Sequence, residues 1–218
     1  MAGPRITVLI SGRGSNLASL LTAMQAGTLG GTITDVIANK PGAGGLGIAA
    51  AHGVATHVVP HQDYPTREAF DAALAERIDA CRPDLVVLAG FMRVLGAPFV
   101  RRYEGRMLNI HPSLLPSYPG LHTHRRALAD GVRVHGCTVH FVTPDVDVGP
   151  IVAQAVVPVH DHDDEDTLAA RVLAAEHVLL PAVVGWYCAG ALAIVGHRVR
   201  VRGVEAGSTG VLFAPAAR

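Results

Sequence analysis

The sequence has few cysteines, few aromatic residues and almost no lysine. Its three cysteines, Cys81, Cys137 and Cys188, are odd in number, lie far apart and form no C-x-x-C pair, which argues against a disulfide framework or a thiolate zinc site. Lys40 is the only lysine, and the formal net charge is zero. Without an overall basic field to attract nucleic acid or anionic lipid, we expect neither kind of partner. The cysteine usage favours a reducing compartment, so we expect a cytoplasmic protein.

Long uncharged apolar runs are also scarce. The apolar run 6–10 near the start is too short for a signal peptide. The segment 178–195 approaches the length of a membrane span, but Pro181, Gly185 and Gly190 interrupt it. We interpret this segment as the buried end of a helix that runs into a strand.

What the chain does have is an alternation of strand-length apolar runs with helical patterns. Half of its 218 residues are apolar. The expected strands are 6–11, 36–38, 57–59, 85–89, 107–110 and 151–159, and the expected helices begin near 17 and 66 and cover 167–184. The tail 194–213 reads as short strands joined by glycines. This alternation predicts an α/β fold with a doubly wound, mainly parallel sheet, in which ligands bind beyond the carboxyl ends of the strands.

The segment 11–16 joins the first expected strand to a helix and reads Ser-Gly-Arg-Gly-Ser-Asn. Gly12 and Gly14 allow the backbone to approach an anion, and a helix start offers free N–H groups. Neither the Walker A pattern nor the dinucleotide fingerprint is met, because no Lys-Ser/Thr pair follows and Leu17 takes the third glycine position. The segment therefore predicts a site for one phosphate group, formed by Gly12, Arg13, Gly14, Ser15 and Asn16. A tight turn that needs glycines for geometry alone explains the segment equally well.

The segment 109–116, Asn-Ile-His-Pro-Ser-Leu-Leu-Pro, lies where another strand ends. Asn109 and His111 are two residues apart, so they point to the same side of the strand. An amide donor and an imidazole at one point suit a developing oxyanion. Taken alone, His111 could equally be a structural histidine beside a proline turn.

The same segment, followed by Tyr118 and Gly120, resembles the signature of the folate-dependent formyltransferases. The run 136–142 and the later Asp145-x-Asp147-x-Gly149-Pro150-Ile151 resemble the second signature of that family. The resemblance extends from about 6 to 181. It implies transfer of a formyl group from 10-formyltetrahydrofolate, as co-substrate, to an amine, without a metal or a tightly bound cofactor.

Three features are similar to the branch of the family that formylates glycinamide ribonucleotide in purine biosynthesis: the loop 11–16, the segment 119–124 and the end near 218. The resemblance implies one formyltransferase domain over 1–218, with a phosphate-binding half (about 1–105) and a catalytic and folate half (about 106–218). The oligomeric state, monomer or homodimer, stays open.

The resemblance assigns catalysis to Asn109, His111 and Asp147. Asn109 and His111 would hold the oxygen of the tetrahedral intermediate, while Asp147 would favour the charged form of the imidazole. A turn aspartate before Gly149 is the structural alternative for Asp147. Val148 departs from the family pattern, which has glycine there.

The resemblance also implies binding residues. The ribonucleotide phosphate would bind at 12–16 and its sugar at Glu176, for which an exposed helix glutamate is the alternative. Folate would bind the following residues: Arg67, Met92, Arg93, Val94, Leu95, Asn109, Thr143, Pro144, Asp145, Val146 and Asp147. Core packing is the rival explanation for the apolar members, and a solvated charge is the rival for Arg67.

Four histidines, His122, His124, His135 and His140, have no cysteine or carboxylate at ligand spacing, so we expect no metal site there. His140 alternates inward on a strand, near His111. Two functional alternatives remain: a hydrolase that releases formate from the same folate, and a non-catalytic folate- or nucleotide-binding protein. The combination of Asn109, His111 and Asp147 argues against the second, because binding alone requires none of them.

Overall fold

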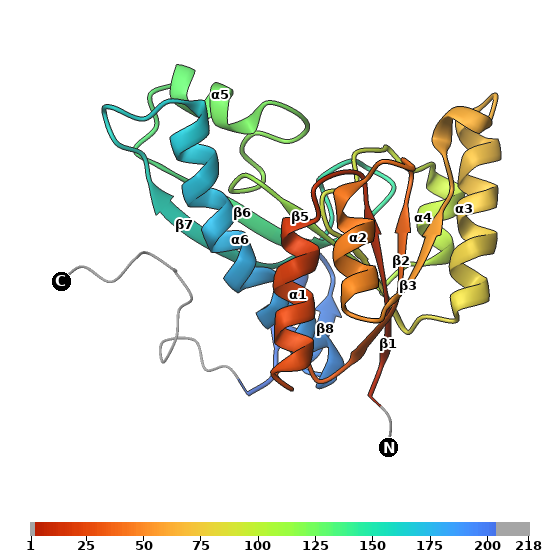
Figure 1. Cartoon of the computed structure of the whole chain (residues 1–218). Helices are drawn as coiled ribbons and strands as arrows, with labels where there is room; N and C mark the ends of the chain where they lie inside the picture. The colour runs from red at the N-terminus through yellow and green to blue at the C-terminus, as the bar shows by residue number, and fades with distance from the viewer. Residues whose placement is uncertain (1–2, 204–218) are drawn as a thin grey trace.

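Nine strands form one sheet in the order β3-β2-β1-β4-β5-β6-β7-β9-β8 in this computed structural model, which describes residues 3–203 (Figure 1). The strands are β1 (Arg5–Ile10), β2 (Thr32–Ala38), β3 (Ala55–Val58), β4 (Leu85–Leu88), β5 (Met107–His111), β6 (Val134–Phe141), β7 (Ile151–Pro158), β8 (Leu192–Val195) and β9 (Arg198–Val201). The helices are α1 (Ser15–Gln25), α2 (Gly44–Ala51), the short 3-10 helix η1 (His61–Asp63), α3 (Arg67–Cys81), α4 (Ala97–Arg102), α5 (Thr123–Ala129) and α6 (Glu165–Cys188).

The first five strands are parallel to one another, and β6 and β7 add antiparallel neighbours. β9 pairs with β7 in parallel and with β8 in an antiparallel hairpin. The predicted α/β class and its doubly wound, mainly parallel sheet are therefore confirmed. One sheet runs through both halves that the sequence suggested.

Helices cover the two faces of the sheet unequally. One face carries a large apolar core that buries Leu17 and Leu20 of α1 and Val172 and Leu179 of α6. The other face carries a smaller core, with Phe70 and Leu74 of α3 and Phe99 of α4 over β1, β2 and β4. The second core reaches β5 only at Met107, so the centre of the sheet is less covered on this side.

The long helix α6 is apolar enough to cross a membrane by length and composition alone. Asp164 begins it with a capping box, in which its side chain accepts from the Thr167 N–H while the Thr167 hydroxyl accepts from the Asp164 N–H. Its buried residues face β6, β7 and α1. The segment 178–195 does run from the end of a helix into a strand, as the sequence indicated, and the part of the expected tail beyond 203 lies outside the described residues.

Candidate active site

The candidate site lies on the less covered face of the sheet, at β5 and β6. Asn109 and His111 point to this face because they alternate with Leu108 and Ile110, which face the core under α1 and α6. The pairing of the strands aligns a row of residues across the sheet, one from each of β1, β4, β5 and β6: Leu9, Leu88, Asn109 and His140. The polar partners of the His111 side chain, Tyr118 and Asp147, both come from loops.

His111 is held between two loops. Its Nε2 lies 3.0 Å from the backbone oxygen of Tyr118, to which it donates, and its Nδ1 lies 3.5 Å from Oδ2 of Asp147. The side chain is almost fully buried. The histidine and the distant aspartate that the sequence paired by family resemblance are thus brought together.

His140 fixes the orientation of Asn109. Nδ1 of His140 donates to the backbone oxygen of Phe141 at 3.0 Å, so in the neutral ring Nε2 accepts from Nδ2 of Asn109 at 3.1 Å. Burial lowers the pKa of His140, which favours this neutral state. Sequence reasoning placed His140 near the site without a role; strand register, which sets it opposite Asn109, supplies one.

Asp147 reaches the site because the segment 142–149 folds back over the sheet. The Phe141 N–H donates to the Pro150 oxygen at 3.0 Å and closes this segment. Asp147 takes a left-handed conformation, with φ of 57°, and its Oδ2 accepts from the Gly120 N–H at 2.8 Å. A Cβ on Gly149 would lie 1.8 Å from the Phe141 oxygen, so only glycine fits there.

The departure from the family pattern at Val148 does not disturb this geometry. Among the non-glycine residues of the loop, Asp147 and not Val148 has the positive φ that favours glycine. The Val148 side chain is 69% exposed, so it displaces no neighbour.

The glycine-rich loop lies at the end of β1, on the same edge of the sheet. Gly14 takes a left-handed conformation, with φ of 82°, immediately before α1. A Cβ on Gly14 would lie 2.5 Å from Cα of Gly45 in α2, whereas a Cβ on Gly12 would meet nothing within 4 Å. Gly14 is therefore required by packing, and Gly12 leaves open space at the helix start.

Glu176 of α6 contacts this loop, although 160 residues separate it from Asn16. Nδ2 of Asn16 donates to Oε2 of Glu176 at 2.7 Å, and both side chains are buried. Burial raises the pKa of Glu176, while the bond from Asn16 acts in the opposite direction. The alternative of an exposed helix glutamate is thus wrong for the conformation seen here.

Apart from Arg67 in α3 and Asn109 in β5, the expected folate residues lie on loops after β4 and β6. Met92, Val94 and Val146 are 62%, 54% and 51% exposed. Leu95, in contrast, is buried in the second core. The N–H of Met92 donates to Oγ of Ser11 at 2.7 Å, which joins this loop to the glycine-rich loop. Core packing therefore accounts for Leu95 but not for Met92, Val94 or Val146. Of the other members after β6, Thr143 is half-buried while Pro144 and Asp145 are exposed.

Two arginines of the expected folate set gather near the start of α3. The guanidinium of Arg93 lies 5.7 Å from the centre of the Phe70 ring. Arg67 is half exposed and its Nη2 lies 3.7 Å from a carboxylate oxygen of Glu68. Burial raises the pKa of Asp71, while the charges of both arginines act to lower it, so both lie within electrostatic reach of this carboxyl.

Within residues 3–203, the four histidines that lack ligand spacing do not form a metal-binding cluster with carboxylates, although His140 lies 3.8 Å from Asp147. His124 and His135 lie edge to face, with ring centres 5.3 Å apart, and burial lowers the pKa of both. Among the described residues, three possible ligands do lie together elsewhere, namely Asp35, His57 and Cys81. Sequence spacing gave no signal for them, because they come from two strands and the end of a helix.

Comparisons with known proteins point to one family. The family model described as formyl transferase matches residues 4–184. The phosphoribosylglycinamide formyltransferase of Escherichia coli (strain K12) is 51% identical over 187 residues, which cover 86% of this chain and 88% of that protein. The crystal structure of glycinamide ribonucleotide transformylase 1 from Symbiobacterium toebii is 48% identical, with a TM-score of 0.89 over 91% of this chain and 94% of that one.

A formyltetrahydrofolate deformylase from Burkholderia mallei ATCC 23344 has the same fold, with a TM-score of 0.84 and 30% identity over 92% of this chain and 70% of that one. The fold alone therefore does not separate formyl transfer from formyl hydrolysis. The length of the family match and the identity to its members are sufficient to assign the chain to a family. This chain belongs to the formyl transferase family.

Proposed function

We propose that this protein transfers the formyl group of 10-formyltetrahydrofolate to the amine of glycinamide ribonucleotide in purine biosynthesis. The observation that carries the proposal is the meeting of Asn109, His111 and Asp147 on the less covered face of the sheet, on the same edge as the glycine-rich loop. Neighbouring strands lie about 4.8 Å apart, so the ends of β1 and β5, which flank β4, are roughly 10 Å apart. A ribose phosphate held at the loop can therefore present its amine at Asn109.

The proposed reaction is direct attack of the amine on the formyl carbon. Asn109, oriented by His140, and His111 donate to the oxygen of the tetrahedral intermediate. In the structure His111 donates to the Tyr118 carbonyl, so the formyl oxygen would take the place of that acceptor. Asp147 stabilises the imidazole as charge develops, and a water carries the proton from the amine to the folate nitrogen.

The binding roles follow the positions of the side chains. The N–H groups at Gly12, Arg13, Gly14, Ser15 and Asn16 would hold the phosphate, and Glu176 the sugar. Met92, Val94 and Val146 would cover the folate, while Arg67 and Arg93 would attract its glutamyl carboxylates. We expect one domain over 1–218 and a cytoplasmic location. The proposed chemistry uses no metal.

The second candidate is formate release by hydrolysis, because a deformylase shares the fold. The glycine-rich loop favours transfer, since the ribonucleotide carries a phosphate and tetrahydrofolate does not. Pure protein should be incubated with 10-formyltetrahydrofolate, with and without glycinamide ribonucleotide, and the products identified by mass spectrometry. We expect formylated ribonucleotide when the amine is present and little formate in its absence. Formate release at a rate independent of the ribonucleotide would instead establish the hydrolase.

A further inference from the structure

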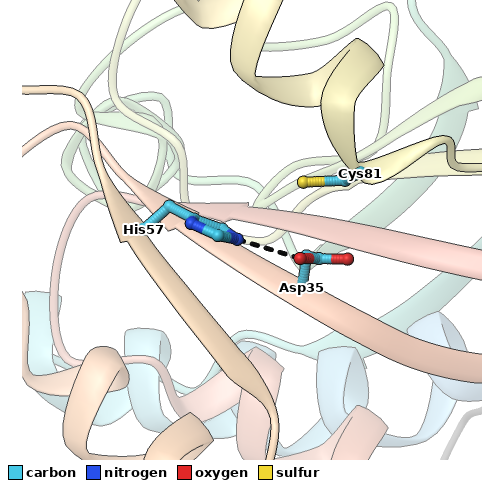
Figure 2. Close-up of side chains that lie close together, drawn as sticks. All are labelled: Asp35, His57 and Cys81. Carbon is cyan, nitrogen blue, oxygen red and sulfur yellow. Dashed lines mark hydrogen bonds and ion pairs between the residues drawn. The ribbon is translucent and has the colours of Figure 1, made fainter.

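A cluster of three metal-binding side chains lies away from the active site. Asp35 comes from β2, His57 from β3 and Cys81 from the end of α3, and Figure 2 shows the Cys81 sulfur pointing toward the His57–Asp35 pair. The active site lies at the carboxyl ends of the strands. Asp35 lies inside β2, four residues before Asn39, which follows the end of that strand. Four residues of extended strand span roughly 13 Å. The cluster is thus separate from the catalytic residues along the strands and across the sheet.

The ligand atoms already lie close to the separation that a metal requires. The His57 nitrogen, the Cys81 sulfur and a carboxylate oxygen of Asp35 all lie within 4.8 Å of one another, with His57 Nε2 and Asp35 Oδ1 at 2.9 Å. In a tetrahedral zinc site, ligand atoms at their usual bond lengths are roughly 3.5 Å apart. To enclose an ion, His57 would give up its hydrogen bond to Asp35, and the Cys81 thiol its bond to the Arg77 backbone oxygen at 3.2 Å. Asp35 and Cys81 are both buried.

The surrounding groups leave one side of the carboxylate available. Oδ2 of Asp35 faces Arg5, whose Nη2 lies 3.8 Å away and donates to the Cys81 backbone oxygen at 3.0 Å. Oδ1 faces the histidine and the thiol side of the cluster. Arg5 would thus act as an outer partner that orients a ligating carboxylate, as such partners do in known metal sites.

A buried hydroxyl lies beside the cluster. Thr7 is paired with Asp35 in the sheet and is fully buried, and its Oγ1 has no partner other than the neighbouring Cys81 thiol, which is a weak one. Buried polar groups are nearly always satisfied. A metal-bound water in a fourth position would give this hydroxyl a stronger partner.

We propose that Asp35 Oδ1, His57 Nε2 and Cys81 Sγ form a structural site for one zinc ion. The mixed oxygen, nitrogen and sulfur ligands select a thiophilic ion such as zinc over magnesium or calcium. Burial and the neighbouring Asp35 raise the pKa of the Cys81 thiol to about 11, so the metal-free cysteine is protonated. On binding, the S–H bond breaks, the sulfur–zinc bond forms with the sulfur electron pair, and the proton passes to solvent. The site stabilises the packing of α3 on β2 and β3 and takes no part in formyl transfer.

Cobalt(II) provides a spectroscopic test, because it occupies zinc sites and shows a thiolate charge-transfer band only when bound to sulfur. The full-length protein, stripped with a chelator, is titrated with Co²⁺ and then with Zn²⁺. We expect one Co²⁺ per chain, the thiolate band, and its loss when zinc displaces cobalt. Zinc should also raise the melting temperature of the stripped protein.

Two serine variants provide the matched comparison. Cys81→Ser should lose the thiolate band. It should also weaken cobalt binding by at least ~100-fold, because the loss of an outer partner already costs up to that much and Cys81 is a direct ligand. Cys188→Ser, which changes a cysteine of another part of the fold, should behave like the wild type. His57→Gln, at a partly exposed position, should weaken binding similarly and serves if Cys81→Ser does not fold.

A wild-type protein without the thiolate band, or equal binding by Cys81→Ser, would overturn the proposal. The three side chains would then form only an ion pair between His57 and Asp35 beside a buried thiol. In that case zinc would leave the melting temperature unchanged.

Discussion

The carboxylate of Asp147 contacts partners from three separate parts of the chain. It accepts from Gly120 and faces His111 at 3.5 Å and His140 at 3.8 Å. Asp147→Asn keeps the size of the side chain, an acceptor for Gly120 and the tolerance for a left-handed backbone, but removes the negative charge. We expect kcat to fall by more than ~10²-fold, the usual scale for losing an acid–base partner, with a much smaller change in folate binding.

Steady-state kinetics and a folate-binding titration of the same preparation test this prediction. Asp166→Asn makes the same chemical change at an exposed helix residue and should retain wild-type turnover. Near-normal turnover of Asp147→Asn would remove Asp147 from the catalytic set.

His135 is a buried residue whose contribution to stability depends on pH. Burial, assisted by the neighbouring His124, lowers the pKa of His135 from 6.5 to about 4. The folded state holds this ring neutral, so the unfolded state binds more protons between these values. The stabilisation is complete above about pH 6.5 and is lost as the pH falls toward 4.

His135→Gln should therefore flatten the fall of the unfolding free energy between pH 7 and pH 5. One titrating group changes this slope by at most ~1.4 kcal/mol per pH unit. Urea unfolding at several pH values measures it, with the exposed His197→Gln as the control. An unchanged slope in His135→Gln would show that the ring is already charged in the fold.

At the scale of elements, the glycine-rich loop combines a packing role with an open binding surface. Gly14→Ala forces a left-handed backbone on alanine and a contact of 2.5 Å with Gly45, so we expect the unfolding free energy to fall by about 1–3 kcal/mol or more. Gly12→Val adds a side chain in open space and should leave that free energy nearly unchanged. It should weaken ribonucleotide binding, because the side chain occupies the space beside the helix start.

Calorimetric titration with the ribonucleotide and with folate, together with denaturant unfolding, separates these effects. Gly12→Val should lose affinity for the ribonucleotide and not for the folate. Equal ribonucleotide binding by Gly12→Val and the wild type would show that the phosphate binds elsewhere.

At the scale of the whole molecule, strand order places the parts of the site on one edge. β1 and β5 are far apart in sequence, yet only β4 separates them in the sheet. Glu176 of α6 reaches Asn16 because α6 packs on α1. Both halves of the chain thus contribute to one proposed substrate site.

Chelation tests whether the reaction of the intact protein needs a metal. Extended treatment with a chelator should leave kcat unchanged, because the proposed chemistry uses hydrogen bonds and charges of side chains and water. The melting temperature should fall if the Asp35–His57–Cys81 site was filled beforehand. Loss of kcat on stripping, with recovery on adding metal, would contradict a metal-free reaction.

The sequence by itself determined the fold class and the local geometry within single elements. Alternating apolar patterns predicted a mainly parallel sheet, and the two-residue period of a strand predicted that Asn109 and His111 share a face. The helical pattern that begins near 66 likewise predicted α3, in which Thr66 is the N-cap and Phe70 and Leu74 are buried. The short helices α2, α4 and α5 were missed, because eight residues or fewer contain too little periodic signal and their stability comes from packing.

Only the tertiary structure decided which distant side chains meet. The register of β5 with β6 sets His140 against Asn109. The fold of the loop 142–149 brings Asp147 to His111, a pair that only the family resemblance had implied. The packing of α3 on the sheet brings Cys81 to Asp35. Local patterns report the period and burial of one segment, whereas these contacts depend on strand order, register and helix docking, which are fixed by burial of apolar surface over the whole chain.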